Sequence, residues 1–431
     1  MSVDHRIIKK RALTKRIFGL SLRTIKKLPH FPFLFIALPC SLFLILIFPF
    51  VKIKFIRLCS DRIGHYAMNT ELLLCHLDEI KRKEKKVKYF FYLLNAPICN
   101  VQLHIMWKRV IRILPFTKII MQVDNVMQFI FRDKYKNSAL KKFETGAGNE
   151  DVEGYFKKFN THLSFTNIEL QRGRQLLLTL GIPIGARYVC LYVRDATYLS
   201  RHYPKKDWSY HFYRDCDIQN FSKAALYLAN KGYYVIRMGK AVAKAFNIKN
   251  PKIIDYAKNQ LRSDFLDIYL TAHCQFFIST SAGLDGVAQI FRKPILFVNV
   301  APLQHQLQYW YPCNLFIIKK IFDKTKNHFI SLKELDRKIL GIHNLNKTFE
   351  ENNWEIVDNN ADEILEAVSE MESFIFRQEY KEKNNPFRSL LENSLTFSML
   401  PHRHLLRSDP EKFYIKMCDQ FWLRNQFLFS E

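Results

Sequence analysis

The sequence lacks the short motifs by which many enzymes and metal-binding proteins are recognised. None of its nine cysteines stands in a CxxC, a CxxxC or a Cys/His pair at ligand spacing, which argues against a structural zinc site. GxxxxGK(S/T), GxSxG and HExxH are also absent, which excludes P-loop kinases, α/β-hydrolases and zincins. With only 13 glycines and 15 prolines, the chain is no fibrous repeat.

The sequence has few acidic residues in comparison with its basic residues. The 431 residues carry 66 Lys and Arg against 40 Asp and Glu, a net charge of +26, while 48% of the residues are hydrophobic. That composition gives a folded chain of two or three domains that attracts anions. No helix-turn-helix, zinc finger or RNP-like strand is present, so we expect no nucleic-acid partner. Anionic lipid headgroups and phosphorylated substrates account for the same charge.

One long run without charge, residues 31–51, stands out near the N-terminus. At about 1.5 Å per residue a helix of this length measures roughly 30 Å, enough to cross a hydrocarbon core. Pro39 interrupts the run, and both flanks are basic, so the positive-inside rule favours a cytoplasmic position for each flank. We therefore expect monotopic attachment to the cytoplasmic face of the inner membrane, with a single span and an N-terminal core helix as alternatives.

Short apolar runs alternate with helical periodicity along the rest of the chain. This alternation predicts an α/β protein with two parallel-sheet domains that face a cleft. The strongest predicted strands are Val87–Leu94, Arg187–Val193, Tyr233–Met238, Gln275–Ser279 and Ile295–Val300. The predicted divisions are a basic and hydrophobic membrane-attachment segment (1–52), a first α/β domain (53–180), a second (181–325) and a mostly helical extension that packs back on the body (326–431).

Polar side chains follow several predicted strands of the second domain. Arg194 and Arg237 end two of them, and the turn Ser279–Gly283 joins a third to a helix. Ligands of open parallel sheets bind at the carboxyl ends of strands, and a glycine-containing turn at a helix N-terminus suits phosphate. Taken singly, such a turn is common and such an arginine can form a surface ion pair. Together they predict a diphosphate site, in which arginine stabilises a departing negative charge.

Two further signals lie outside those strand ends. Asp215-Cys216-Asp217 is a DxD pattern, but it opens a helix, where acidic residues compensate the helix dipole, so we predict no metal site. In the first domain, Gly64 and His65 lie in a loop after a strand. A histidine there is a candidate general base for an acceptor hydroxyl, with a structural role in the turn as the alternative, and Glu71 is a weaker candidate.

Several blocks of the sequence resemble a poorly characterised family of bacterial glycosyltransferases encoded in surface-polysaccharide gene clusters. The matching blocks run in order along the chain: Ser60–Glu71, Gly181–Asp195, Tyr213–Ile218, Gly232–Gly239, Ile253–Tyr256, Ser263–Leu270, Phe276–Leu284, Pro294–Asn299 and Phe421–Phe429. The resemblance implies a GT-B arrangement, in which two Rossmann-like domains face a cleft and the second holds most of a nucleotide-sugar donor. It implies no cofactor beyond that co-substrate.

The resemblance also assigns roles to individual residues. It implies donor contacts for the following positions: Arg194, Arg237, Gly239, Asp264, Ser279, Thr280, Ser281 and Gly283. Gly64 and His65 would lie on the acceptor side. Beside this, we expect Glu71 on the acceptor side as the weaker base candidate, and His65 and Arg194 as the catalytic residues. The predicted activity is an inverting, metal-independent sugar transfer to a lipopolysaccharide, capsule or similar glycan, possibly lipid-linked. A sulfo- or phosphotransferase on a similar scaffold and a non-catalytic membrane-surface protein are the alternatives.

Overall fold

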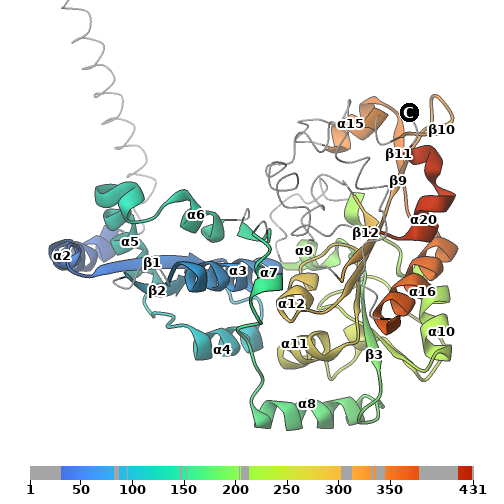
Figure 1. The fold of residues 1–431 in the computed structure, drawn as a ribbon, viewed down its shortest axis with the longest axis horizontal. Helices are drawn as coiled ribbons and strands as arrows, with labels where there is room; N and C mark the ends of the chain where they lie inside the picture. Colours follow the sequence, from blue (N-terminus) through green and yellow to red (C-terminus); the bar gives the residue numbers. More distant parts are fainter. Residues whose placement is uncertain are drawn as a thin grey trace, which may run out of the picture.

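The protein is an α/β protein with parallel sheets. The computed structural model describes residues 31–81, 87–94, 96–145, 148–151, 153–202, 204, 213–301, 313–331, 334–335, 345–377 and 416–429. They form two lobes side by side, a first lobe with elements α2 to α7 and a second lobe with elements α8 to α20 (Figure 1). The basic residues 1–30, part of the predicted attachment segment, lie outside the described residues.

The first lobe is built on two parallel strands joined by a long helix. Strands β1 (Lys52–Leu58) and β2 (Val87–Leu93) pair in parallel, and α3 (Ile63–Lys81) connects them. Tyr66, Leu73 and Leu77 recur along one face of α3 and are buried in the core. The remaining helices are α4 (Val101–Val110), α5 (Thr117–Phe131), α6 (Ser138–Lys141) and α7 (Tyr155–Lys158).

The apolar run near the N-terminus forms helix α2 (Phe31–Ile47), which contains Pro39 and packs against α5. Ala37, Ser41 and Phe48 are buried on its inner side, and the Phe48 ring stacks on Phe131 with centroids 4.0 Å apart. Among the helices of the described ranges, none has the length and apolar character that a membrane crossing requires.

The second lobe is a seven-stranded sheet in which all pairs are parallel, in the order β12-β8-β7-β6-β3-β4-β5. Its strands are β3 (Tyr188–Tyr192), β4 (Tyr234–Arg237), β5 (Ile253–Ile254), β6 (Phe277–Ser279), β7 (Ile295–Val300), β8 (Leu315–Ile318) and β12 (Lys416–Met417). All six residues of β7 are buried, as expected of a strand covered on both faces.

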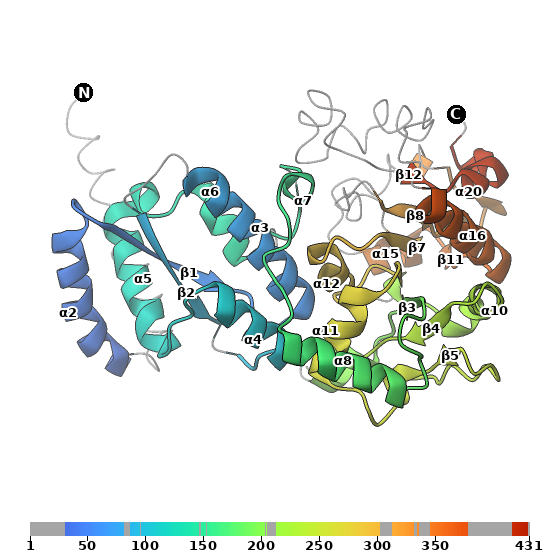
Figure 2. The same cartoon turned by 60° about the horizontal axis from the view of Figure 1, so that its bottom comes forward.

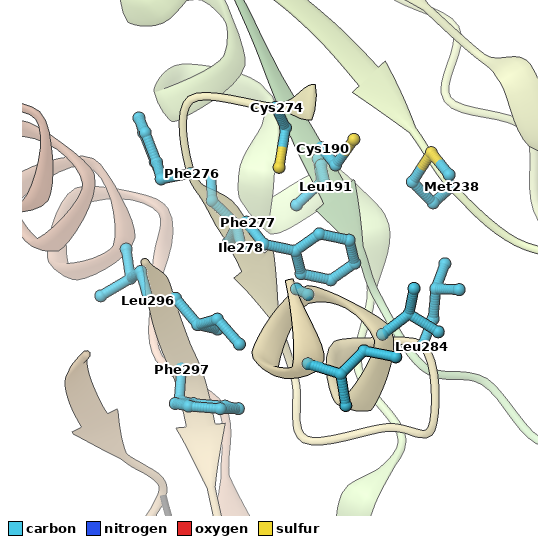
Figure 3. Packing of buried hydrophobic residues seen from close by; sticks show 14 of the residues in the cluster. Cys190, Leu191, Met238, Cys274, Phe276, Phe277, Ile278, Leu284, Leu296 and Phe297 are labelled. Atoms are coloured by element: carbon cyan, nitrogen blue, oxygen red, sulfur yellow. The ribbon is translucent and has the colours of Figure 1, made fainter. Parts of the chain in front are cut away.

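Helices cover both faces of this sheet. Helices α11 (Asp264–His273) and α12 (Asp285–Ile290) lie on the face toward the first lobe, and α10 (Ser222–Asn230) and α16 (Ala361–Arg377) lie on the other (Figure 1). Between α12 and the sheet, Phe277, Leu284 and Leu296 pack in one continuous core (Figure 3). The short helix α9 (Thr197–His202) follows β3.

Helix α8 (Asn167–Thr179) lies against α11 of the second lobe, although the predicted boundary after residue 180 assigns it to the first domain. Gly173 permits this approach, because a Cβ there would stand 2.0 Å from Cε2 of Tyr269. The two lobes also meet where α3 packs on α12 and α4 packs on α11. The domain boundaries themselves stay predictions.

The described residues of the predicted C-terminal extension, 326–431, contain short strands as well as helices. They include β10 (His328–Phe329) and β11 (Trp354–Val357), which pair with β9 (Lys320–Asp323) in an antiparallel sheet, and β12, which joins the large sheet. Asn327, in the turn between β9 and β10, and Asn353, in the turn just before β11, adopt positive φ. The helices are α15 (Leu345–Glu351), α16, α20 (Asp419–Arg424) and the 3-10 turn Gln426–Leu428.

Candidate functional site

Two arginines stand at the carboxyl ends of neighbouring strands. Arg194 comes just after β3, where its backbone N–H donates to Oγ1 of Thr280 over 2.8 Å and its guanidinium pairs with Asp215. Arg237 is the last residue of β4 and is only 1% exposed. Its Nη1 donates to Oδ1 of Asp255 over 2.9 Å. The structure therefore brings both predicted arginines to the same edge of the sheet.

The Ser279–Gly283 turn lies at the end of β6 and leads into α12. The Asp285 carboxylate fixes it, because Oδ2 accepts both the Ser279 hydroxyl over 2.9 Å and the Ala282 N–H over 2.8 Å. Ser281 adopts a φ of 58°, the left-handed region that a tight turn requires. Burial raises the pKa of Asp285 to about 7, although the Ser279 hydroxyl and the Arg214 charge act in the opposite direction.

Arg214 is a third arginine of this site, and the sequence-based selection of strand ends missed it. Its guanidinium donates to the carbonyl oxygen of Ser281. The signal that could have found it is the Tyr213–Ile218 block, in which Arg214 directly precedes the DxD pattern. Arg214 reaches the turn from an irregular segment before the 3-10 turn Ile218–Phe221, so strand periodicity gives no indication of its position.

Three buried donors at this edge have no hydrogen-bond partner among the described residues: Nε of Arg214, Nε of Arg237 and Oγ of Ser281. Buried polar groups in folded proteins are almost always paired, and each exception calls for an explanation. Guanidinium and hydroxyl donors match the oxygens of phosphate groups. Each of these three donors is therefore of a kind suited to an anion oxygen.

A cavity of about 310 Å³ opens at the same edge, beside Arg237. Its polar lining consists of Asp195, Asp215, Asp217, Arg237, Lys244 and Asp358. Most of these carboxylates already face a cation: Lys244 lies 2.8 Å from Asp217, and Lys319 lies 2.8 Å from Asp358. A ligand here would meet cations suited to phosphate and carboxylates that can accept hydrogen bonds from hydroxyl groups.

The DxD carboxylates have separate roles. Asp217 caps the Ile218–Phe221 turn by accepting the Gln219 N–H over 3.1 Å, and the hydrogen bond from Lys244 lowers its pKa. Burial raises the pKa of Asp215, while the adjacent Arg194 acts in the opposite direction. Helix capping and pairing with arginine thus account for the two acids.

Two residues predicted to bind the donor have other contacts in the structure. Gly239 has a φ of 149°, and a Cβ there would stand 2.8 Å from Cγ1 of Val242. Asp264 opens α11 and joins the lobes, because its Oδ2 accepts the Val101 N–H over 2.8 Å. Whether either one contacts a donor stays a prediction.

Gly64 and His65, predicted to lie in a loop, instead stand in the first turn of α3, and this turn meets the Ser279–Gly283 turn directly. A Cβ on Gly64 would lie 3.0 Å from Cα of Gly283, so the start of α3 touches the turn before α12. His65, the next residue, is half-buried, with Nδ1 3.3 Å from Oδ1 of Asn69. Burial, together with the Arg62 charge, lowers the pKa of His65, so its imidazole is neutral near pH 7 and can accept a proton.

Glu71 lies at the other end of α12, away from the turn. It is fully buried and bonded to Nη2 of Arg292 over 2.8 Å, with Nδ1 of His162 at 3.2 Å. Glu71, Cys75 and His162 could together offer three ligand atoms to a metal ion. Burial alone would lower the pKa of His162, but Glu71 and Asp78 raise it. The cluster is therefore best explained as an ion-pair network between the lobes.

Comparisons with known proteins were made for both sequence and structure. No protein-family model matches the sequence, and no curated protein matches it. Among solved structures, a glycosyl transferase family 9 protein from Veillonella parvula is 11% identical, covering 76% of this chain and 98% of its own, with a TM-score of 0.43. ADP-heptose lipopolysaccharide heptosyltransferase II from E. coli is 12% identical, covering 76% and 99%, with a TM-score of 0.36.

A putative UDP-N-acetylglucosamine 2-epimerase from Listeria monocytogenes is also similar, at 8% identity and a TM-score of 0.32, covering 77% of this chain and 98% of its own. The similar structures thus include glycosyltransferases and an epimerase. With TM-scores below 0.5, this similarity identifies no function for this chain.

Proposed function

We propose that this chain is a glycosyltransferase that moves a sugar from a nucleotide-sugar donor to a surface-glycan acceptor. The observation that carries the proposal is the presence of unpartnered buried donors on Arg237, which lines the cavity, and on Arg214 and Ser281 of the neighbouring turn. A nucleoside diphosphate supplies the missing acceptor oxygens, and its ribose hydroxyls can donate to the carboxylates of the cavity. The sequence resemblance to glycosyltransferases of polysaccharide gene clusters supports the same activity.

In this proposal the reaction is a single displacement that inverts the sugar carbon. The neutral imidazole of His65 removes the proton from an acceptor hydroxyl, and the resulting oxygen attacks the anomeric carbon. The bond to the nucleoside diphosphate breaks, and that group leaves with the bonding electrons. Arg194, Arg237 and the Ser279–Gly283 turn stabilise its growing negative charge. These donors already supply the neutralising charge, so the proposal includes no metal.

The proposed acceptor is a lipopolysaccharide, capsule or similar glycan, and the proposed site of action is the cytoplasmic face of the inner membrane. Nucleotide sugars are cytoplasmic, and the two basic flanks of the 31–51 run favour that side. A lipid-linked acceptor would be within reach of a protein attached to this face.

Thermal stabilisation by nucleotides tests the donor site. The purified chain is heated with UDP, GDP, ADP, CMP or 3′-phosphoadenosine 5′-phosphate, alongside Arg237→Lys, which keeps the charge but loses the fork geometry. Arg187→Lys is the matched control, since Arg187 lies just before β3, at the opposite end of the sheet, against the Tyr233 ring. A ligand at 100 times its Kd adds about 2.7 kcal/mol of stability.

The proposal expects one nucleoside diphosphate to raise the melting temperature of the wild type and of Arg187→Lys, and to raise that of Arg237→Lys much less. A shift with 3′-phosphoadenosine 5′-phosphate alone would instead identify a sulfotransferase. If no nucleotide shifts the wild type, the donor proposal is wrong, and a non-catalytic membrane-surface role becomes the better explanation.

A further inference from the structure

Helix α2 is apolar on both of its sides. Its inner side, with Ala37 and Ser41, packs on α5. Its outer side and the turn that follows expose large hydrophobic side chains: Ile36, Leu38, Leu42, Phe43, Leu46 and Phe50, here called the α2 outer face. Leu46 is 73% exposed and Phe50 is 76% exposed. A surface helix of a globular protein normally turns a polar side to water, and a helix that is apolar all round is normally buried all round.

Cations stand at both ends of this face. At the start of α2, Nζ of Lys118 lies 5.4 Å from the centre of the Phe33 ring. At its other end, Lys52 is exposed as the first residue of β1. Exposed Arg132 and Lys134 follow Phe131, the residue that stacks on Phe48. The neighbouring acid Asp133 lies 3.4 Å from Lys141.

This combination of charge and apolar surface favours an anionic lipid surface over a second copy of the chain. A two-fold dimer through the α2 outer face would bring identical cation clusters toward each other, and like charges repel. In an anionic bilayer, the acyl chains can bury the apolar side chains of the α2 outer face, and the anionic headgroups can pair with the cations at its two ends.

We propose that the α2 outer face docks flat on an anionic bilayer, with α2 lying in the plane of the headgroup and acyl boundary. This proposal specifies how the membrane attachment in the proposed function takes place. It rests on the proposed function for the acceptor, whereas the docking itself rests on the exposed face. Helix α2 lies at the end of the molecule farthest from the large sheet (Figure 2). The donor cavity in the second lobe therefore stays in water, and the first lobe contacts the membrane.

Vesicle flotation of the purified full chain tests the docking. Vesicles of phosphatidylglycerol with phosphatidylethanolamine are compared with vesicles of phosphatidylcholine alone. The variant Phe43→Ser/Leu46→Ser removes two exposed side chains of the face. The matched control Ile168→Ser/Phe376→Ser removes two side chains of the second lobe that are 78% and 77% exposed. None of these side chains is in the core, so all three proteins should fold.

We expect the wild type and the control to float with the anionic vesicles, and the face variant to lose about tenfold or more of its partitioning. Equal flotation of the face variant and the wild type would overturn the proposal and move the membrane contact to another segment. A wild type that does not float, but forms a dimer in sedimentation that the face variant loses, would assign the face to a second copy. The nucleotide-induced shift of the melting temperature, measured on the same three proteins, tests the donor site independently of the membrane docking.

Discussion

The turn that carries the candidate phosphate site depends on one buried acid, Asp285, and removing its charge is the most informative perturbation. The carboxylate accepts two hydrogen bonds through one oxygen, from Ser279 and from the Ala282 N–H. Asp285→Asn keeps one acceptor oxygen for these two hydrogen bonds, removes the ability to ionise and replaces the second carboxylate oxygen by an NH2 donor. The variant therefore separates the charge of the group from its part in holding the turn.

The size of the effect follows from the pKa of Asp285, which burial raises to about 7 in the folded protein. In the unfolded chain an aspartate has a pKa of about 3.9. Between these values the folded state binds more protons than the unfolded state, so this group makes stability fall as pH rises through the window. The difference of about 3 between the two pKa values corresponds to a loss of about 4 kcal/mol in the free energy of unfolding, and the whole of this loss is present above pH 7. Asparagine does not ionise, so the variant lacks this loss.

Thermal unfolding of the wild type and of Asp285→Asn at pH 5, 6, 7 and 8 measures the difference. About 1.5 kcal/mol of the loss has already occurred at pH 5, so we expect the stability advantage of the variant over the wild type to grow by about 2.7 kcal/mol between pH 5 and pH 8. For a chain of 431 residues this corresponds to a change of roughly three degrees in the difference between the melting temperatures. Other acids, such as Asp267, whose pKa burial raises to about 6, affect both proteins equally and cancel. A difference between the two proteins that stays constant from pH 5 to pH 8 would refute the assignment of a buried, proton-binding carboxyl to Asp285.

Two further predictions concern the junction between the lobes. His65→Ala should abolish turnover and leave the nucleotide-induced shift of the melting temperature unchanged; loss of that shift as well would contradict a role as base. In the wild type, the apparent pKa of the acid limb of the pH–rate profile should lie below the ordinary histidine value of 6.5. Gly64→Ala places a Cβ 3.0 Å from Cα of Gly283, so we expect a destabilisation of about 1–3 kcal/mol and reduced turnover. An unchanged melting temperature would show that the lobes separate freely at this contact.

The sheet of the second lobe could be predicted from the sequence because its central strands are continuous apolar runs. Ile295–Val300 is buried at every position, and such runs are distinctive in a parallel sheet. Strand β12 has only two residues, Lys416 and Met417, and carries no periodicity of its own. Its pairing with β8 is decided by tertiary contacts, which explains why this strand was not predicted from the sequence.

The candidate site could be predicted where it depends on strand ends, and not where it depends on irregular segments. Arg194 and Arg237 were found because each follows a recognisable strand. Arg214 was missed because it reaches the Ser281 carbonyl from an irregular segment 67 positions away in the chain. The pairing of Glu71 with Arg292 spans 221 positions, so no local pattern reports it.

The place of β12 in the sheet has a consequence for the order in which the chain can fold. The strand pairs with β8, which lies about a hundred residues earlier, and α20 then packs on α16. During synthesis the first lobe and the central strands are complete well before Lys416 emerges, and domains generally fold as units from the N-terminus. The edge of β8 stays open until Lys416 and Met417 have left the ribosome, so a truncation before residue 416 exposes a strand edge that promotes aggregation.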